Sequence, residues 1–282
     1  RKPLLLLSVD VESWSCSDFF ESQRDTIAEA ETIKEPLEWI LNVLNKYEVS
    51  ITFFFVAQFA EVKPELIKMV IENGHEIASH GYSHISLTNT DANRALFELQ
   101  HSKHVLEKIT RLKVLGYRSP SAKSNENLLL VEKAGYKYDS SLVRSIPIPN
   151  WYGDLRMDSY PFKLNKLPAY KRVSSDIIEF PISSNPTIKL PMSAWWIRNL
   201  GFTYFVKSVA SSLKKYNYCA FYMHPWEFSF KFPSIKVPFH VKRNIGAHMR
   251  KSLVYVLEKW GKSGYIMTYL LFTQDRIDLS QL

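Results

Sequence analysis

The sequence predicts an α/β protein whose mostly parallel sheet is covered by helices on both faces, as in a β/α barrel. Two observations predict this fold. Short apolar runs alternate along the chain with longer segments in which apolar residues recur every three to four positions. The apolar runs are nearly unbroken, which is typical of strands buried on both faces of a parallel sheet. The length of 282 residues suits a single β/α barrel.

Strands and helices are predicted in alternation along the first half of the chain. Helices are placed where apolar residues recur on one face, and where Pro64 opens and Gly74 follows an apolar segment. Strands are placed on the short apolar runs between these helices. The predicted strands are residues 3–9, 50–57, 75–79 and 113–117, and the predicted helices are residues 36–48, 64–74, 91–109 and 125–135.

The alternation is interrupted between residues 143 and 200. This stretch is rich in proline and contains one strand-like run, residues 176–182, so we expect long loops over the mouth of the barrel. The alternation then returns, with predicted helices at 202–216 and 243–264 and predicted strands at 218–223 and 265–272. No internal repeat or low-complexity tract divides the chain, and one domain over residues 1–282 is expected.

The net charge is +8, and much of the basic excess lies between residues 228 and 274. Eight basic residues occur there against one acid, Glu258: Lys231, Lys236, Lys242, Arg243, Arg250, Lys251, Lys259 and Lys262. Such a segment can dock on an anionic carrier or a membrane surface, and a solvated helix face is the alternative. No nucleic-acid motif accompanies the charge, so no nucleic-acid partner is expected.

The cellular location is weakly constrained by the sequence. No apolar run approaches the roughly 18 residues of a membrane span. Two cysteines, Cys16 and Cys219, form no disulfide framework and favour a reducing compartment. A cytoplasmic or peripheral membrane location is therefore favoured. An extracytoplasmic one stays open, because the first residue is Arg rather than Met.

Several predicted strands are followed by a residue with useful chemistry. These residues are Asp10 and Glu12, His80 and His84, Arg118, and His224. In a β/α barrel the carboxyl ends of the strands meet at one face, where active sites lie. His80 and His84 are four positions apart, so a helical turn would place both on one side for metal binding. Two ordinary loop histidines are the alternative.

Together these side chains suit the hydrolysis of an amide or an ester. Two histidines and one carboxylate form the three-ligand set of a catalytic zinc site, although cobalt, nickel or manganese can occupy similar ligands. A second carboxylate can accept a proton, and a separate histidine can protonate a leaving group. Arg118 can keep that second carboxylate ionised.

The chain resembles the polysaccharide deacetylases with a NodB-homology domain, carbohydrate esterase family four. The matching segments are LSVDVES, ITFFFVAQFAEVKPELIKMVIENGHEIASHGYSH, GYRSPSA, GYKYDSSL, EFPIS and FYMHPWEF. The DVE and HPWEF forms are most similar to the branch linked to exopolysaccharide synthesis. The resemblance implies a distorted, TIM-like barrel, often with seven parallel strands. It also implies a metal-dependent hydrolase that removes N-acetyl groups from an envelope polysaccharide, an exopolysaccharide or a lipid-linked precursor.

The resemblance also implies roles for individual residues. His80 and His84 match the metal histidines of the family, Asp10 the catalytic base, Arg118 the arginine that tethers the base, and His224 the general acid. The backbone N–H of Ser121 matches the donor that stabilises the oxyanion.

Two departures from the family pattern affect these roles. The family's metal-binding aspartate is replaced by Val11, and Glu12 is the nearest substitute. In an extended strand Glu12 points the same way as Asp10. We expect Glu12 to bind the metal and Asp10 to act as the base, with the exchanged roles as the alternative. Leu142 and Val143 stand where the family often has Asp-Trp, so the carboxylate partner of His224 stays open among Asp139, Glu179 and Glu227.

Tryptophans near the predicted barrel mouth are candidates for sugar binding. Trp151, Trp195 and Trp196 can form walls on which sugar rings stack, and core packing is the alternative. Trp226 can join them, or it can pack against His224 and position it. Two other functions remain open: hydrolysis of a small cyclic amide or ureide, as in allantoinases, and glycan binding without catalysis. An open mouth favours a glycan substrate, and a small closed pocket favours a ureide.

Overall fold

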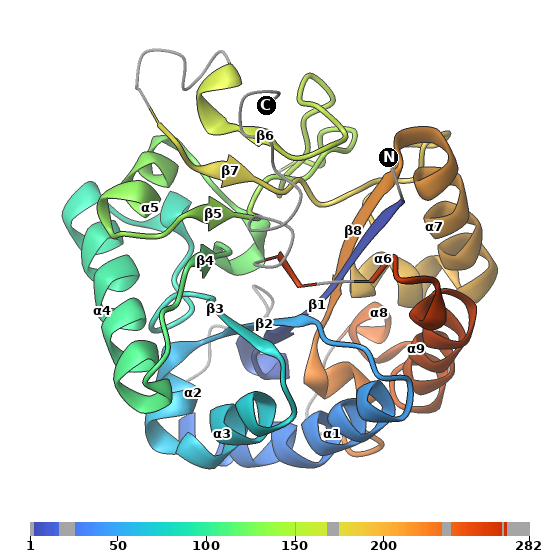
Figure 1. Ribbon diagram of the computed structural model, residues 1–282, viewed down its shortest axis with the longest axis horizontal. Helices are drawn as coiled ribbons and strands as arrows, with labels where there is room; N and C mark the ends of the chain where they lie inside the picture. Colours follow the sequence, from blue (N-terminus) through green and yellow to red (C-terminus); the bar gives the residue numbers. More distant parts are fainter. Residues whose placement is uncertain are drawn as a thin grey trace.

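The computed structural model describes residues 3–16, 26–149, 151–167, 175–232, 238–266 and 268–269. Its strands form one curved sheet in the order β6-β7-β5-β4-β3-β2-β1-β8 (Figure 1). They are β1 (Leu4–Val11), β2 (Thr52–Phe55), β3 (Glu76–Ser79), β4 (Gly116–Tyr117), β5 (Tyr138–Asp139), β6 (Phe162–Lys163), β7 (Ile178–Glu179) and β8 (Tyr218–Met223). Neighbouring strands are parallel except β6 and β7, which are antiparallel.

The predicted α/β class and distorted barrel are confirmed, in a form more open than a closed TIM barrel. Parallel pairs join all the strands except β6, which adds an antiparallel edge. Because β6 and β8 stand at opposite ends of the strand order, the described strands form a half-barrel. The chain after β7 reaches across to β8, where the Ser183 N–H donates to the Ala220 carbonyl at 2.9 Å.

Helices surround the outer side of the sheet (Figure 1). They are α1 (Thr26–Lys46), α2 (Ala57–Val62), α3 (Pro64–Glu72), α4 (Ala92–Thr110), α5 (Leu130–Lys133), α6 (Ala194–Leu200), α7 (Phe202–Tyr216), α8 (Phe239–Lys242) and α9 (Ala247–Trp260). Among the described residues, no helix combines the length and the apolar composition that crossing a membrane requires.

Several boundaries differ from the sequence prediction. α1 begins at Thr26 rather than at residue 36, because buried Ala30 and Ile33 extend its apolar face upstream of Pro36. The predicted strand 50–57 ends at Phe55, and α2 begins two residues later.

The two least regular regions also differ from their predictions. The proline-rich stretch contains β6 and α6 in addition to the predicted strand β7. Of the predicted strand 265–272, Ile266 forms a bridge with Leu5, and most of the remainder lies outside the described residues.

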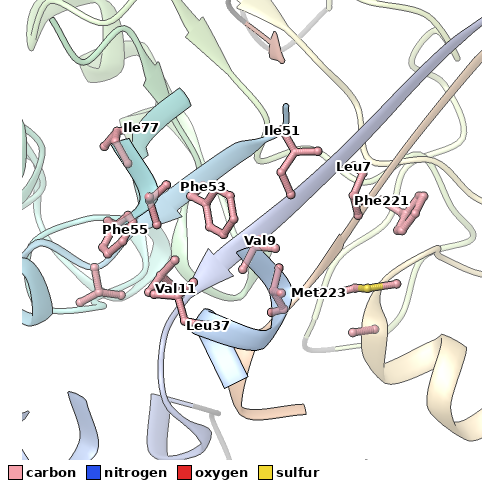
Figure 2. Close-up of a cluster of buried hydrophobic side chains, with 14 of the residues drawn as sticks. Leu7, Val9, Val11, Leu37, Ile51, Phe53, Phe55, Ile77, Phe221 and Met223 are labelled. Carbon is pink, nitrogen blue, oxygen red and sulfur yellow. The ribbon is translucent and has the colours of Figure 1, made fainter. Parts of the chain in front are cut away.

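Alternate residues of β1 pack into two different apolar layers. Leu5, Leu7, Val9 and Val11 belong to the large cluster between the sheet and the helices, part of which Figure 2 shows. Leu4 and Leu6 belong to a smaller cluster on the other face, with aromatic residues of β2, β5 and β8. Because side chains alternate along a strand, Asp10 points to the same face as Leu4 and Leu6. The apolar alternation of β1 therefore determines which way Asp10 faces.

Candidate metal and catalytic site

Three buried side chains from distant parts of the chain converge beyond the carboxyl ends of β1 and β3. Glu12, His80 and His84 each offer one ligand atom, and these atoms lie within 4.8 Å of one another. Glu12 Oε2 is 2.7 Å from His84 Nε2 and 3.4 Å from His80 Nε2. This buried group is consistent with a divalent metal site.

The hydrogen bonding around the group fits a metal ligand set. His80 Nδ1 lies 2.9 Å from the Arg118 carbonyl oxygen, which can only accept a hydrogen bond. The neutral ring therefore carries its hydrogen on Nδ1 and turns the lone pair of Nε2 toward Glu12, as a metal-binding histidine does. Burial raises the pKa of Glu12, but the nearby His224 and His84 lower it. The net pKa lies well below its usual value, so the carboxylate is charged.

The loop from His80 to His84 is not the helical turn on which the spacing argument relied. Its residues are not helical, and His84 adopts a left-handed backbone conformation with φ of 60°. Buried Glu98 of α4 holds this loop. The Glu98 carboxylate accepts hydrogen bonds from the backbone N–H of Ser83 at 2.9 Å and from the Ser83 hydroxyl at 2.8 Å. The sequence analysis did not single out Glu98. The signal that could have found it is an acidic residue on the buried face of α4.

Asp10 forms a buried ion pair with Arg118, and both side chains face the inner side of the sheet. Arg118 Nη1 lies 2.5 Å from Asp10 Oδ1 and also donates to the Ser8 hydroxyl at 2.9 Å. Its Nη2 donates to the hydroxyls of Ser140 and Tyr269, each at 2.9 Å. Burial lowers the pKa of Arg118, but its neighbours, Asp10 first among them, together raise it, and the net pKa lies above its usual value. The guanidinium is thus a fixed cation against Asp10.

Ser121 lies in the short 3-10 helix Pro120–Ala122 that follows β4, and it lines the same pocket as Asp10. Its φ is 58°, a left-handed conformation that is uncommon outside glycine, and Ala122 has a φ of 50°. This tight double turn lies close in sequence to Arg118. The role of the Ser121 N–H as oxyanion donor stays a prediction.

β8 pairs with β1 on the edge away from β2 and β3. His224, which follows β8, therefore reaches the metal group from the side opposite to His80 and His84. Its Nε2 lies 3.5 Å from Glu12 Oε1, and its Nδ1 lies 3.1 Å from Glu227 Oε2. Of the three candidate partners, the structure places Glu227 against His224. Asp139 instead accepts hydrogen bonds from Ser141, and Glu179 accepts one from the Leu142 N–H. Burial lowers the pKa of His224, but Glu12 and Glu227 raise it to about 9.

One pocket of about 320 Å³ brings the candidate residues together. Its lining includes Asp10, Glu12, His80, His84, Ser121 and His224, together with Trp151, Trp195 and Trp226. Trp196 is not part of this lining; it packs against Trp195 and donates from Nε1 to the Tyr152 hydroxyl at 3.2 Å. A second hollow of about 400 Å³ shares Trp151 with the first, so the two adjoin along one wall.

Two parts of the chain match known protein families. A family model described as polysaccharide deacetylase matches residues 32–138, and one described as a domain of unknown function (DUF3473) matches residues 141–255. Residues 32–138, less than half of the chain, are thus similar to the polysaccharide deacetylase family.

Three comparisons show how far the similarity of this chain to known proteins extends. A peptidoglycan deacetylase of Helicobacter pylori is 29% identical over 182 residues, which cover 61% of this chain and 57% of that protein. A polysaccharide deacetylase structure from Mycobacterium smegmatis has a TM-score of 0.71 at 18% identity, covering 100% of this chain and 95% of that one. The structure of PuuE allantoinase has a TM-score of 0.67 at 15% identity, covering 97% and 91%. The two structures support the fold alone.

The candidate site draws on both matched regions and on the segment before them. His80, His84 and Arg118 lie in the polysaccharide deacetylase region, whereas His224 lies in the second region. Asp10 and Glu12 precede both. Strands from all three parts belong to one sheet, which explains why residues so far apart in sequence share one pocket.

Exchanging each carboxylate for its amide separates the roles of Asp10 and Glu12. Asp10→Asn is expected to retain the metal, since Asp10 is not in the ligand group, and to lose about 10²–10⁴-fold in rate, because an amide cannot take up a proton. Glu12→Gln is expected mainly to weaken metal binding. Metal analysis and turnover measured on the same samples test both statements. If Asp10→Asn loses the metal while Glu12→Gln keeps it, Asp10 is the metal ligand and Glu12 the base.

Proposed function

We propose that this protein is a polysaccharide deacetylase that removes the N-acetyl group from a sugar of an exopolysaccharide, an envelope polysaccharide or a lipid-linked glycan precursor. One observation carries the proposal: a candidate base, a three-ligand metal group and a candidate acid line the same pocket. Because these groups enter from β1, β3 and β8, the sheet holds them at fixed separations. This is the set of groups that hydrolysis of an acetamide requires.

The residues of this chain divide the reaction between them. A divalent ion held by Glu12, His80 and His84, for which zinc fits the ligands best, supplies Lewis-acid activation of water and of the acetamide carbonyl. Asp10 accepts the proton from the attacking water, and its contact with Arg118 holds the carboxylate in place.

The remaining groups act on the carbonyl oxygen and on the leaving nitrogen. The Ser121 N–H donates to the oxyanion that forms as water adds to the carbonyl carbon. His224, with Nδ1 turned to Glu227, gives its Nε2 proton to the leaving nitrogen. The carbon–nitrogen bond then breaks, which releases acetate and the free amino sugar.

The shape of the pocket supports a glycan over a small ureide. Trp151, Trp195 and Trp226 offer indole faces and edges on which sugar rings can pack. The adjoining hollow beyond Trp151 leaves room for a further sugar unit, which a ureide would not need. Similarity to an allantoinase in fold keeps the ureide as the second candidate.

An acetate-release screen tests the proposal directly. Purified protein is incubated with N-acetylated oligosaccharides and, in parallel, with allantoin, before and after metal removal by a chelator. We expect acetate from at least one glycan, loss of release after chelation, and recovery on adding Zn²⁺, Co²⁺, Ni²⁺ or Mn²⁺. Turnover of allantoin alone would favour the ureide hydrolase. Glycan binding without turnover by the metal-loaded protein would favour a non-catalytic relative.

We also propose that the basic segment 228–274 docks on an anionic membrane or lipid carrier through a basic-aromatic patch. The patch comprises Phe230, Lys231, Phe239, Lys242 and Arg243, all exposed, with the two phenylalanines 66% and 76% accessible. The Gly246 N–H donates to the Glu227 carbonyl, which brings the two parts of the patch near each other. Arg250 is not included, because it pairs with Glu35 at 2.7 Å. Lys236 lies outside the described residues.

Neutralising the patch is expected to weaken vesicle binding. Each basic residue near an anionic surface contributes about 1 kcal/mol, so changing Lys231, Lys242 and Arg243 to Gln should reduce partitioning on the order of 100-fold. Co-sedimentation with phosphatidylglycerol vesicles at low salt measures this change. The matched control changes Lys251, Lys259 and Lys262, which lie on or just beyond α9, to Gln. If both triple variants lose vesicle binding equally, the loss reflects net charge rather than the patch.

A further inference from the structure

Arg198 of α6 is a buried cation that no motif of the sequence singled out. Its side chain is only 1% accessible, and its Nε lies 2.6 Å from Glu227 Oε1. Its Nη1 donates to the carbonyl oxygens of Val241 at 2.9 Å and Arg243 at 2.8 Å. The guanidinium thus joins α6, the turn after β8 and the segment around α8, and it lies directly behind the carboxylate that contacts His224.

We propose that Arg198 is a positioning residue that holds Glu227 in the orientation from which it aligns His224 for proton donation. The inference rests on the proposed deacetylase function. It adds a residue that lies outside the metal group, the base and the acid.

The two oxygens of Glu227 have separate partners, and this division supports the inference. Oε1 faces Arg198, while Oε2 accepts the His224 backbone N–H at 3.0 Å and lies 3.1 Å from His224 Nδ1. Since Arg198 occupies Oε1, the carboxylate cannot rotate without losing a charged hydrogen bond. The imidazole is thereby held with Nδ1 against Glu227 and Nε2 toward the pocket, where Glu12 Oε1 lies 3.5 Å away.

Burial makes the cation necessary. Glu227 is fully buried, so its carboxylate depends on protein partners rather than on bulk solvent. Burial by itself raises the pKa of Glu227, and Arg198 is the strongest of the influences that lower it below its usual value. Without Arg198, an uncompensated buried carboxylate would favour its neutral form and would hold His224 less firmly.

The variants are chosen to isolate this chain of contacts. Arg198→Gln removes the charge, and Arg198→Lys keeps a cation that can reach one oxygen but cannot span both Glu227 and the two carbonyls. Glu227→Gln removes the carboxylate, and the double variant combines it with Arg198→Gln. Asn199→Ala is the matched control, because Asn199 tethers the neighbouring His240 carbonyl from the same helix at 3.2 Å without touching Glu227.

The kinetic readout compares two substrates that differ in their need for an acid. Acetate release from chitotetraose requires protonation of an amine, whereas 4-nitrophenyl acetate has a leaving group that needs little. For Arg198→Gln we expect kcat on chitotetraose to fall about 10–100-fold, the usual loss on removing a supporting partner, with little change in KM. The ester should lose only a few-fold, and metal content should not change. Arg198→Lys should recover part of the amide rate, and Asn199→Ala should match the parent on both substrates.

The double variant and a crystal structure complete the test. Because Arg198 acts through Glu227, the double variant should be no slower than Glu227→Gln alone, and multiplying losses would overturn the inference. Equal losses on amide and ester would also overturn it. The crystal structure of Arg198→Gln should show the Glu227–His224 Nδ1 contact lengthened beyond hydrogen-bond distance, and an unchanged contact would contradict the inference. A parent that releases acetate neither from chitotetraose nor from any other N-acetylated oligosaccharide of the screen counts against the deacetylase function, whereas the crystal structure still decides the positioning role.

Discussion

Replacing His84 with asparagine is expected to release the divalent metal and to abolish turnover. The asparagine amide ends near the position of the imidazole Nδ1, so it falls short of Nε2, the atom that lies 2.7 Å from Glu12. Asparagine also tolerates the left-handed backbone of residue 84, where φ is 60°, so the loop should keep its shape. Loss of one of three protein ligands should weaken metal binding by more than the roughly 10–100-fold caused by losing an outer partner.

The measurement is metal content after dialysis, together with acetate release, for parent and variant at equal concentration. His104→Asn is the matched control, because His104 lies exposed on α4, away from the ligand group. It should retain parental metal and rate. Equal metal in His84→Asn and the parent would remove His84 from the ligand set.

Replacing His224 with alanine is expected to leave the metal bound and to slow acetamide hydrolysis about 10²–10⁴-fold, the usual range for general acid–base catalysis. His224 is not in the ligand group, and its imidazole faces Glu12 from one side and Glu227 from the other. An amine leaves poorly unless it is protonated, so the loss should be largest on an amide. On an activated aryl acetate the loss should be much smaller.

The ratio of the two losses is the decisive quantity for His224. A thermal melt and a metal assay on the same samples exclude unfolding and metal loss as causes. If amide and ester slow equally, or if the variant is free of metal, His224 is not the proton donor. The alternative assignment would then be a fourth metal ligand.

The sequence was informative where a strand ended in a chemical group, and less so where a loop decided the geometry. Asp10, Arg118 and His224 could be placed at one face because the apolar strands before them were unambiguous. His80 and His84 were paired correctly but for an incorrect reason, since their loop is not helical. A spacing of four positions brings two side chains together in a helix. Here a compact loop held by Glu98 brings the two histidines together instead.

The partner of His224 could not be predicted, because the choice depends on a turn that sequence patterns do not resolve. Glu227 lies three positions beyond His224, and the 3-10 turn Pro225–Phe228 folds it back onto the imidazole. Arg198 lay in a stretch that the sequence assigned to loops, and its contact with Glu227 joins residues 29 positions apart. Such contacts follow from tertiary packing rather than from local periodicity.

The pairing of β1 with β8 has a consequence for how the protein is made. Ser8 of β1 donates to the Phe221 carbonyl across 213 positions of sequence, and the whole of β8 runs beside β1. During synthesis the strand carrying Asp10 leaves the ribosome long before its neighbour exists, so one of its edges must wait unpaired. His224, the proposed proton donor, arrives with that late strand. A nascent chain that stops short of β8 already contains Glu12, His80 and His84, yet it lacks His224, the proposed acid.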